Sequence, residues 1–237
     1  MTIEDFIDHN LTGYLFSDLD TMANFELLEG RKYGGVNYPM LMTILAGIEL
    51  LGALVNPRGS VKKINNKKVI EGDAHFVHFW QRYLSEDNLK YKGLNNLFYH
   101  LLRNGIAHTF IAKHNIYVYK SSPHHLSYEI TKPELVVGCK EFAKDLKTTY
   151  EKRIVPILSV KNEKNPDIIS RGRMQSNLDD LLDFYEEESR LEFSNLPPSK
   201  NHLEPHWYSD TRSSLPSLSN VKSEELQITT PSGIKYP

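Results

Sequence analysis

The stretch "YHLLRNGIAHTF", residues 99–110, places one arginine, one asparagine, two histidines and a glycine within a dozen residues. Apolar residues recur at steps of three and four, so a helix over 93–110 is predicted. Positions four apart nearly eclipse on an α-helix, which predicts one polar line. Its members are Asn96, His100, Asn104 and His108. Such a line suits an enclosed site better than open water, because it carries amides and imidazoles where an exposed helix normally carries Lys and Glu.

Gly105 and Arg103 add two constraints to this helix. A glycine inside a helix costs about 1 kcal/mol relative to alanine, so we expect another helix to approach closely at Gly105. Arg103 and His108 are five residues apart, about 140° around a straight helix. Two copies of the helix related by a two-fold axis would bring both residues of each copy into one cleft. A homodimer is therefore expected.

A cleft of this kind suits cleavage of RNA without a metal ion. A histidine with a near-neutral pKa can take a proton from a 2′-hydroxyl or give one to the leaving 5′-oxygen. Arginine offers a planar set of donors to the charge on phosphorus, and Asn104 can orient the imidazole or bind phosphate. On spacing alone, two interpretations stay open: a functional site, or a buried polar network whose members satisfy one another.

The preceding segments predict two more helices and a basic loop. Residues 38–55 form an apolar helical stripe that contains Glu49, and a buried carboxylate there needs a partner, for which we choose Arg103. Residues 73–84 form an aromatic helix that suits a core better than base stacking. On it, His75 and His78 suit packing better than metal binding. The lysine-rich stretch between these helices is either a solvated loop, which we favour, or a phosphate-contacting patch.

The following segments predict a small β-hairpin and another helix. The strands are expected at 115–120 and 126–130, around a solvated turn with two histidines. Thr131 and Glu134 have the spacing of a capping box, so a helix is predicted from there to about residue 153. Antiparallel helices with short connections are typical of such a pattern. The predicted fold is therefore mostly α: an antiparallel helical bundle over 1–155 with one hairpin after the 93–110 helix.

Residues 156–237 are expected to form a polar C-terminal extension. It contains an acidic amphipathic helix at about 177–193 and then a flexible tail rich in Pro, Ser, Asn and Thr. The formal net charge of −2 confines any nucleic-acid contact to a local basic patch. A single cysteine and an N-terminus without signal-peptide features favour a cytoplasmic protein without membrane attachment.

The motif "RNGIAH" resembles the signature of HEPN (higher eukaryotes and prokaryotes nucleotide-binding) domains, in which an arginine and a polar residue precede a histidine by four to six positions. Arg103, Asn104 and His108 match its three elements. The apolar helix "LAGIELLG" before the motif and "AKHNIYVYK" after it also resemble the family. The resemblance covers roughly residues 10–155. One subgroup has a tyrosine two residues after the histidine, and Phe110 stands there in this chain, which argues against that subgroup's modification.

The resemblance implies a dimeric, metal-independent endoribonuclease whose products carry a 2′,3′-cyclic phosphate. Arg103, His108 and Asn104 would be catalytic, and the supporting or RNA-binding residues would be His100, Glu49, Lys113 and His114. No cofactor and no metal is expected. Many relatives are toxins or phage-defence proteins, so a cognate antitoxin or regulator is a further expected partner. Two alternatives remain: a non-catalytic module that binds RNA, nucleotide or protein, and a regulatory partner that masks its target with the acidic helix.

Overall fold

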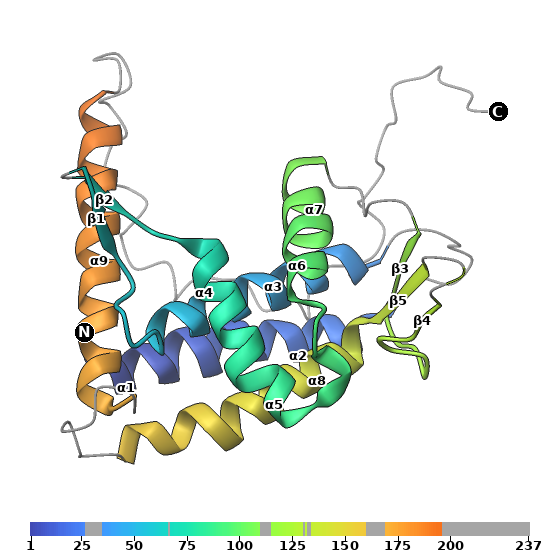
Figure 1. Ribbon diagram of the computed structural model, residues 1–237. Helices are drawn as coiled ribbons and strands as arrows, with labels where there is room; N and C mark the ends of the chain where they lie inside the picture. Colours follow the sequence, from blue (N-terminus) through green and yellow to red (C-terminus); the bar gives the residue numbers. More distant parts are fainter. Residues whose placement is uncertain are drawn as a thin grey trace, which may run out of the picture. The chain divides into compact units, whose positions relative to one another are not determined.

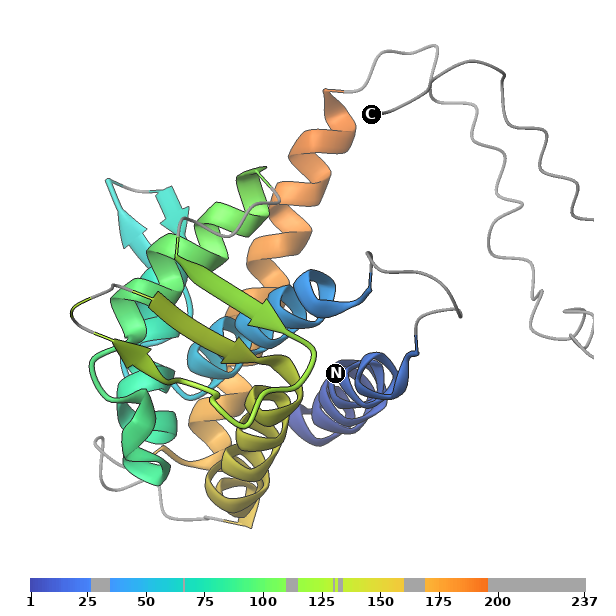
Figure 2. The same cartoon turned by 90° about the vertical axis from the view of Figure 1, so that its right-hand side faces the viewer.

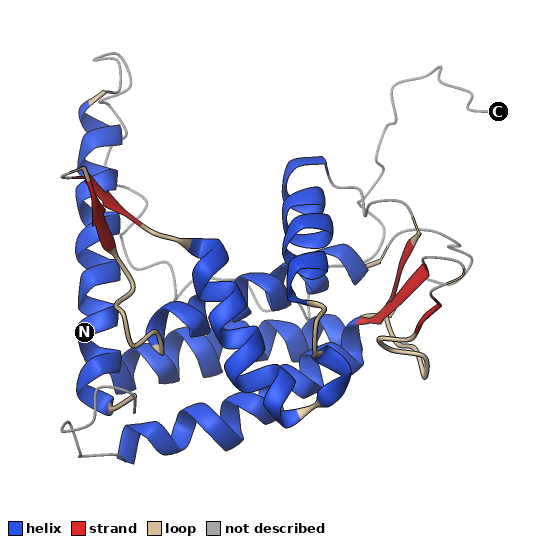
Figure 3. Ribbon diagram, viewed as in Figure 1, coloured by secondary structure: helices blue, strands red, loops and turns tan. Residues whose placement is uncertain are grey.

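The computed structural model describes residues 1–26, 35–65, 67–109, 115–129, 131, 134–159 and 169–195, without the side chains of residues 107–109 and 129. The chain divides into two compact units, Met1–Ser189 and Arg190–Pro237. The described part is mostly helical, as predicted, with two small sheets (Figures 1 and 3). The elements discussed below belong to the first unit, except that the last helix, α9, continues beyond Ser189.

The N-terminal helical segment and α3 form the first part of the core. The segment comprises α1 (Ile3–Phe6), the π-helical η1 (Ile7–Phe16) and α2 (Ser17–Asn24), and Thr2 caps α1 through a capping box with Asp5. The apolar helix α3 (Asn37–Leu54) confirms the predicted one and contacts α2, α4, α7 and α8. It is long and apolar enough to cross a membrane, but a buried core helix passes the same test, and 56% of it is buried here.

The aromatic helix belongs to the core, as predicted, and it lies against α3. It consists of α4 (Gly72–Phe79) and the π-helical η2 (Trp80–Leu84), and α5 (Ser85–Asp87) and the 3₁₀ turn η3 (Leu89–Tyr91) follow. Phe76, Phe79 and Trp80 are fully buried, which excludes base stacking on this face. Gly52 of α3 touches the backbone of His75, and a Cβ at Gly52 would collide with that carbonyl. The two helices can cross this closely because residue 52 is a glycine.

The helix predicted at 93–110 is present but not uniform. It begins as α6 (Asn95–Leu97), continues through the π-helical η4 (Phe98–Arg103) and ends as α7 (Asn104–Thr109). A π turn takes one residue more than an α turn, so it shifts the phase of the polar line. The buried positions are Asn95, Phe98, Leu102, Gly105 and Ile106. Helix α7 also contacts α3.

The strands after this helix are paired differently from the predicted hairpin. The three strands are β3 (Ile116–Tyr119), β4 (Tyr128–Glu129) and β5 (Glu134–Gly138). They form one sheet in the order β3-β5-β4, which Figure 2 shows face on. β5 is parallel to β3 and antiparallel to β4. The hairpin of 115–120 with 126–130 is therefore wrong. β5 lies between the two predicted strands and satisfies the backbone groups of both.

The helix predicted from Thr131 begins later than expected. It starts as α8 (Cys139–Thr149), continues as the π-helical η5 (Tyr150–Ile154) and ends in the 3₁₀ helix η6 (Val155–Ser159). The expected capping box is wrong because Glu134 opens a strand instead. In that strand Leu135 and Val137 are buried, and the backbone pairs on both sides, a gain that outweighs a local helix-start signal.

Two further elements differ from the expectations. The lysine-rich loop forms a hairpin of β1 (Lys62–Ile64) and β2 (Lys67–Val69). The helix expected at 177–193 is α9 (Arg171–Ser194), which begins six residues earlier. Its buried side chains are Met174, Asn177, Leu178, Leu181 and Phe184. Most of α9 is thus part of the first compact unit, and residues 196–237 lie outside the described part of the chain.

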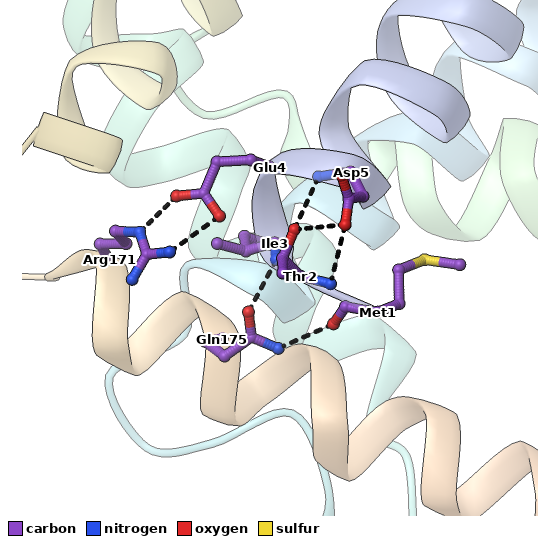
Figure 4. A network of polar contacts seen from close by, with 7 residues as sticks. All are labelled: Met1, Thr2, Ile3, Glu4, Asp5, Arg171 and Gln175. Atoms are coloured by element: carbon purple, nitrogen blue, oxygen red, sulfur yellow. Dashed lines mark hydrogen bonds and ion pairs between the residues drawn. The ribbon is translucent and has the colours of Figure 1, made fainter.

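Polar contacts fasten α9 to the rest of this unit. The Asn177 amide donates to the carbonyls of Leu54 and Asn56 at 2.8 and 2.9 Å. At the first turn of α9, Gln175 accepts from the Ile3 amide at 2.7 Å and donates to the Met1 carbonyl, while Arg171 pairs with Glu4 (Figure 4). The N-terminal segment and α9 therefore hold each other in place.

Candidate functional site

The predicted pairing of Glu49 with Arg103 is present. Glu49 comes from α3 and Arg103 from the last position of η4. Arg103 Nε donates to Glu49 Oε2 at 3.2 Å, and Nη2 lies 3.2 Å from the same oxygen and 3.5 Å from Oε1. The two side chains are 31% and 22% exposed. The ion pair is thus enclosed on one side and open to water on the other.

Three neighbours fix the position of this pair. Asn104 Oδ1 accepts from Arg103 Nη1 at 3.3 Å, and the guanidinium lies 5.6 Å from the centroid of the Tyr99 ring. The Glu49 carboxylate lies against Gly72, the first residue of α4, where any side chain would collide with it. A helix N-terminus favours negative charge, so the carboxylate is stabilised by Arg103 and by the α4 dipole.

The guanidinium keeps hydrogen-bonding capacity for a ligand. Arginine has five N–H groups. Among the described residues, the bonds to Glu49 and Asn104 engage three of them: Nε–H, one on Nη1 and one on Nη2. As far as the described residues go, the second N–H of each terminal nitrogen can make the fork-shaped contact that arginine forms with phosphate or carboxylate.

Two cavities meet at this ion pair. They have volumes of about 330 and 500 Å³ and share Glu49, Ile70, Arg103 and Tyr185 in their walls. The larger is also bordered by Lys68, Tyr99 and Glu188. Burial, and secondarily the charge of Glu49, raises the pKa of Tyr99 and of Tyr185, so both phenols stay protonated at neutral pH. The site thus combines a cation, phenolic donors and ring faces around a space that opens to solvent.

A still larger cavity lies elsewhere but lacks comparable chemistry. It measures about 890 Å³ and lies between α2 and η5. Its charged groups among the described lining residues are Asp20, Lys147 and Glu151, of which Lys147 and Asp20 pair with each other at 2.9 Å. The smaller cavities at Arg103 are therefore the better candidate site, despite their size.

The structure brings together only part of the predicted site. Arg103, Asn104 and Glu49 are in contact. His100 is exposed on the solvent side of the helix. Its ring lies edge-to-face with that of Tyr99, with the two ring centroids 5.5 Å apart. His108 belongs to α7, but its side chain is outside the described part of the structure. Lys113 and His114 lie outside the described residues altogether.

Several residues of this site were not predicted from the sequence. Tyr99 precedes Arg103 by four positions, so helical spacing alone could have found it. Gly72 and Lys68 reach the site through the fold of the segment that joins α3 to α4. Tyr185 reaches it because α9 packs on the core, and no local pattern marks that contact.

His75 has a structural partner on each of its ring nitrogens. His75 Nδ1 accepts from Asn56 Nδ2 at 3.0 Å, and Nε2 donates to the Ser60 carbonyl at 2.8 Å, which supports packing over metal binding. His125 is buried, so the expectation of a solvated turn is wrong for it, whereas His124 is exposed. Within the described part of the chain, no group of three or more His, Cys, Asp or Glu is placed to hold a metal.

His125 belongs to a closed network between the sheet and α8. Its Nδ1 accepts from the Gly138 amide at 3.0 Å, so the proton of the neutral ring is on Nε2. Nε2 lies 3.0 Å from the Tyr91 hydroxyl, which donates to Asp145 at 3.0 Å. Asp145 also accepts from Asn88 at 3.2 Å. Every ring nitrogen of this histidine is used, which leaves none for catalysis.

Comparison with known proteins gives no relative for this arrangement. No protein-family model matches the chain. No curated protein and no solved structure matches it either.

Proposed function

We propose that this protein is a metal-independent endoribonuclease of the HEPN type. The observation that carries the proposal is the placement of Arg103 at the meeting point of two cavities, oriented by Glu49 and Asn104. The motif "RNGIAH" supports it, because α7 continues directly from Arg103 and carries His108 five residues later. A homodimer with the two motif helices at the interface completes the proposed cleft.

The proposed reaction is an internal transfer at phosphorus. A neutral imidazole removes the proton of the 2′-hydroxyl while the 2′-oxygen attacks the adjacent phosphate. The bond from phosphorus to the 5′-oxygen breaks, and an imidazolium gives that oxygen a proton. Two His108 side chains in a dimer would supply both groups. The guanidinium of Arg103 stabilises the extra negative charge, and the products are a 2′,3′-cyclic phosphate and a 5′-hydroxyl.

The test is cleavage of RNA by the purified full chain in the presence of EDTA. Arg103→Ala should lower the rate about 10²- to 10³-fold, as the loss of a charge-stabilising donor does. His108→Ala should lower it about 10²- to 10⁴-fold. His124→Ala, the loss of an exposed histidine, is the matched control and should cut normally. Cleavage that EDTA abolishes, or that His108→Ala leaves unchanged, would contradict the proposal.

The proposed setting is a cytoplasmic toxin or phage-defence nuclease with a cognate antitoxin or regulator. Induced expression of the wild type should then arrest growth, whereas His108→Ala should not. Sedimentation of the wild type at micromolar concentration tests the dimer, and a monomer would contradict the shared cleft.

A non-catalytic binding module is the second candidate. The observation that favours it is the engagement of Arg103 by Glu49, since an arginine held this way can serve as a structural anchor. In that case the wild type binds RNA without cutting it, and Arg103→Ala weakens binding. A cyclic-phosphate product from the wild type decides against this candidate.

A further inference from the structure

The β1–β2 hairpin concentrates positive charge beside the candidate site. It carries Lys62, Lys63, Lys67 and Lys68, and we call residues 62–69 the lysine hairpin. Lys62 pairs with Glu71, just after the hairpin. Lys68 instead pairs with Glu187 of α9, 119 residues away in sequence, at 2.9 Å. Figure 1 shows the hairpin alongside α9.

The part of α9 that faces the hairpin is acidic. Asp180, Asp183 and Glu187 follow one another at steps of three and four, so they lie on one face of the helix, and we call them the acidic edge. The Glu187 carboxylate raises the pKa of Lys68, first through its hydrogen bond and then through its charge, and Asp183 and Asp180 add smaller contributions. The lysine hairpin thus already holds one carboxylate of α9, that of Glu187, and two more lie on the same face of the helix.

The same two elements border the cavity that contains Arg103. The cavity of about 500 Å³ is lined by Lys68, Val69 and Ile70 from the hairpin side and by Phe184, Tyr185 and Glu188 from α9. Arg103, Tyr99 and Glu49 also line it. Cations interleaved with aromatic faces fit a single-stranded nucleic acid, whose phosphates meet lysine and whose bases stack on rings.

We propose that the lysine hairpin is a docking surface for the phosphate backbone of RNA, and that the acidic edge of α9 occupies it in the absence of RNA. This inference rests on RNA being the ligand of the Arg103 site. A carboxylate and a phosphodiester offer lysine the same anionic acceptor, so RNA has to displace the acidic edge. A weaker acidic edge must therefore give tighter RNA binding.

The second half of α9 is less firmly anchored than the first. Its first half is held in the core by Met174, Asn177, Leu178 and Leu181. From Tyr185 to Ser189 its side chains are exposed, and the ion pair of Lys68 with Glu187 is exposed too. Exposed ion pairs contribute little stability, so Glu187 can leave Lys68 without unfolding the unit.

The experiment measures binding of a fluorescent 12-residue oligouridylate with 2′-O-methyl groups, a probe that cannot be cut by 2′-oxygen attack. Asp183→Asn with Glu187→Gln should bind about tenfold tighter than the wild type. Its control is Asp8→Asn with Asp18→Asn, which makes the same change in net charge at exposed sites elsewhere. The triple change Lys63→Ala, Lys67→Ala and Lys68→Ala should weaken binding about tenfold. The slope of log K against log salt should fall by about 0.7 per lost phosphate contact.

The lysine triple has its own control, Lys90→Ala, Lys92→Ala and Lys144→Ala, at exposed positions outside the hairpin. Either test variant behaving like its control overturns the inference, as does the absence of binding in all variants. Competition by polyglutamate as effective as that by RNA also overturns it, because the surface then selects acidic protein.

The experiments distinguish failure of this inference from failure of the nuclease proposal. Probe binding that follows the acidic edge and the lysine hairpin, with natural RNA left uncut, supports this inference and contradicts catalysis. If cleavage depends on Arg103 and His108 but the acidic-edge changes leave probe binding unaltered, the result supports catalysis and contradicts this inference. Amide exchange provides a second measurement. Addition of the probe should speed exchange in residues 182–189 of α9, and unchanged exchange there would contradict displacement.

Discussion

The molecule contains two polar networks that differ in how completely their groups are satisfied. In the Tyr91–His125–Asp145 network, Tyr91 and His125 are buried, Asp145 is half-buried, and the bonds run between protein groups. The Glu49–Arg103–Asn104 network has a similar number of bonds, yet its ion pair is 22–31% exposed and borders two cavities. A histidine or arginine in a polar cluster is therefore no sign of a site by itself. The second network differs from the first in bordering two cavities and, within the described part of the chain, in keeping arginine N–H groups that no protein group takes up.

The largest expected effect is on the closed network. His125→Ala would leave the Gly138 amide and the Tyr91 hydroxyl without their partner in a buried place, at a cost of about 3 kcal/mol in the free energy of unfolding. Urea denaturation should show this loss with an unchanged m-value. The neighbouring His124→Ala should stay within about 0.5 kcal/mol of the wild type, because that side chain is exposed. Equal effects of the two changes would contradict the closed network.

A smaller loss is expected for the central hydroxyl of this network. Tyr91→Phe keeps the ring contacts with Trp80 and Phe142 but removes the bonds to His125 and Asp145, which should cost about 2 kcal/mol. Tyr128→Phe removes a hydroxyl from a side chain that is 63% exposed and should cost almost nothing in the same thermal or urea assay.

The closed network should also make stability depend on pH. Burial lowers the pKa of His125 below its usual 6.5, although the charges of Asp145 and Glu141 oppose the shift and that of Lys90 adds to it. Above about pH 6.5 this contribution to stability is constant. As the pH falls below about 6.5, the unfolded chain takes up a proton that the folded chain resists, so stability falls until the pH reaches the folded-state pKa. Burial lowers the pKa of His78 too, so the two must be separated.

The separation uses unfolding curves recorded between about pH 7 and about pH 5. His78→Gln should keep the part of the slope that comes from His125, and His125→Gln should keep the part that comes from His78. A wild-type stability that rises as the pH falls through this range would contradict both shifts.

The smallest effect is expected at the open network. Glu49→Gln should change the free energy of unfolding by less than about 1 kcal/mol, because water partly screens the ion pair. Arg103→Gln should behave in the same way, and both should fold. A loss above about 2 kcal/mol in either variant would remove the contrast between the networks and would favour the structural interpretation of Arg103.

Sequence patterns predicted the parts of the fold that local periodicity determines. Helix α3 and the helix around Arg103 follow from their apolar spacing, and the pairing of Glu49 with Arg103 follows from the need of a carboxylate inside an apolar helix. The capping-box pattern at Thr131 failed because β5 gains partners on both sides. This gain depends on strand β3, whose Ile116 and Tyr119 pair with residues 19 positions later in the chain.

The candidate site also combines residues that local sequence predicts with residues that only packing brings together. Arg103 and Asn104 were found from the motif, whereas Tyr185 and Lys68 come to the site only when α9 and the hairpin have packed. The local sequence of Ser, Pro and His around His125 predicts a solvated turn. The burial of His125 depends on docking beside Phe142 of α8, with ring centroids 5.8 Å apart, which no short window of sequence contains.

The bond from the Ile3 amide to Gln175 joins residues 172 positions apart, and it has a consequence for the order of folding. At a synthesis rate of about 5–20 residues per second, the ribosome needs roughly ten to thirty seconds to add α9 after residue 3 has been made. During that interval, the surfaces that later receive Met174, Leu178 and Leu181 have no cover from α9. The arrival of α9 is thus the late step of folding, and a nascent chain stalled before residue 171 should expose apolar surface to chaperones.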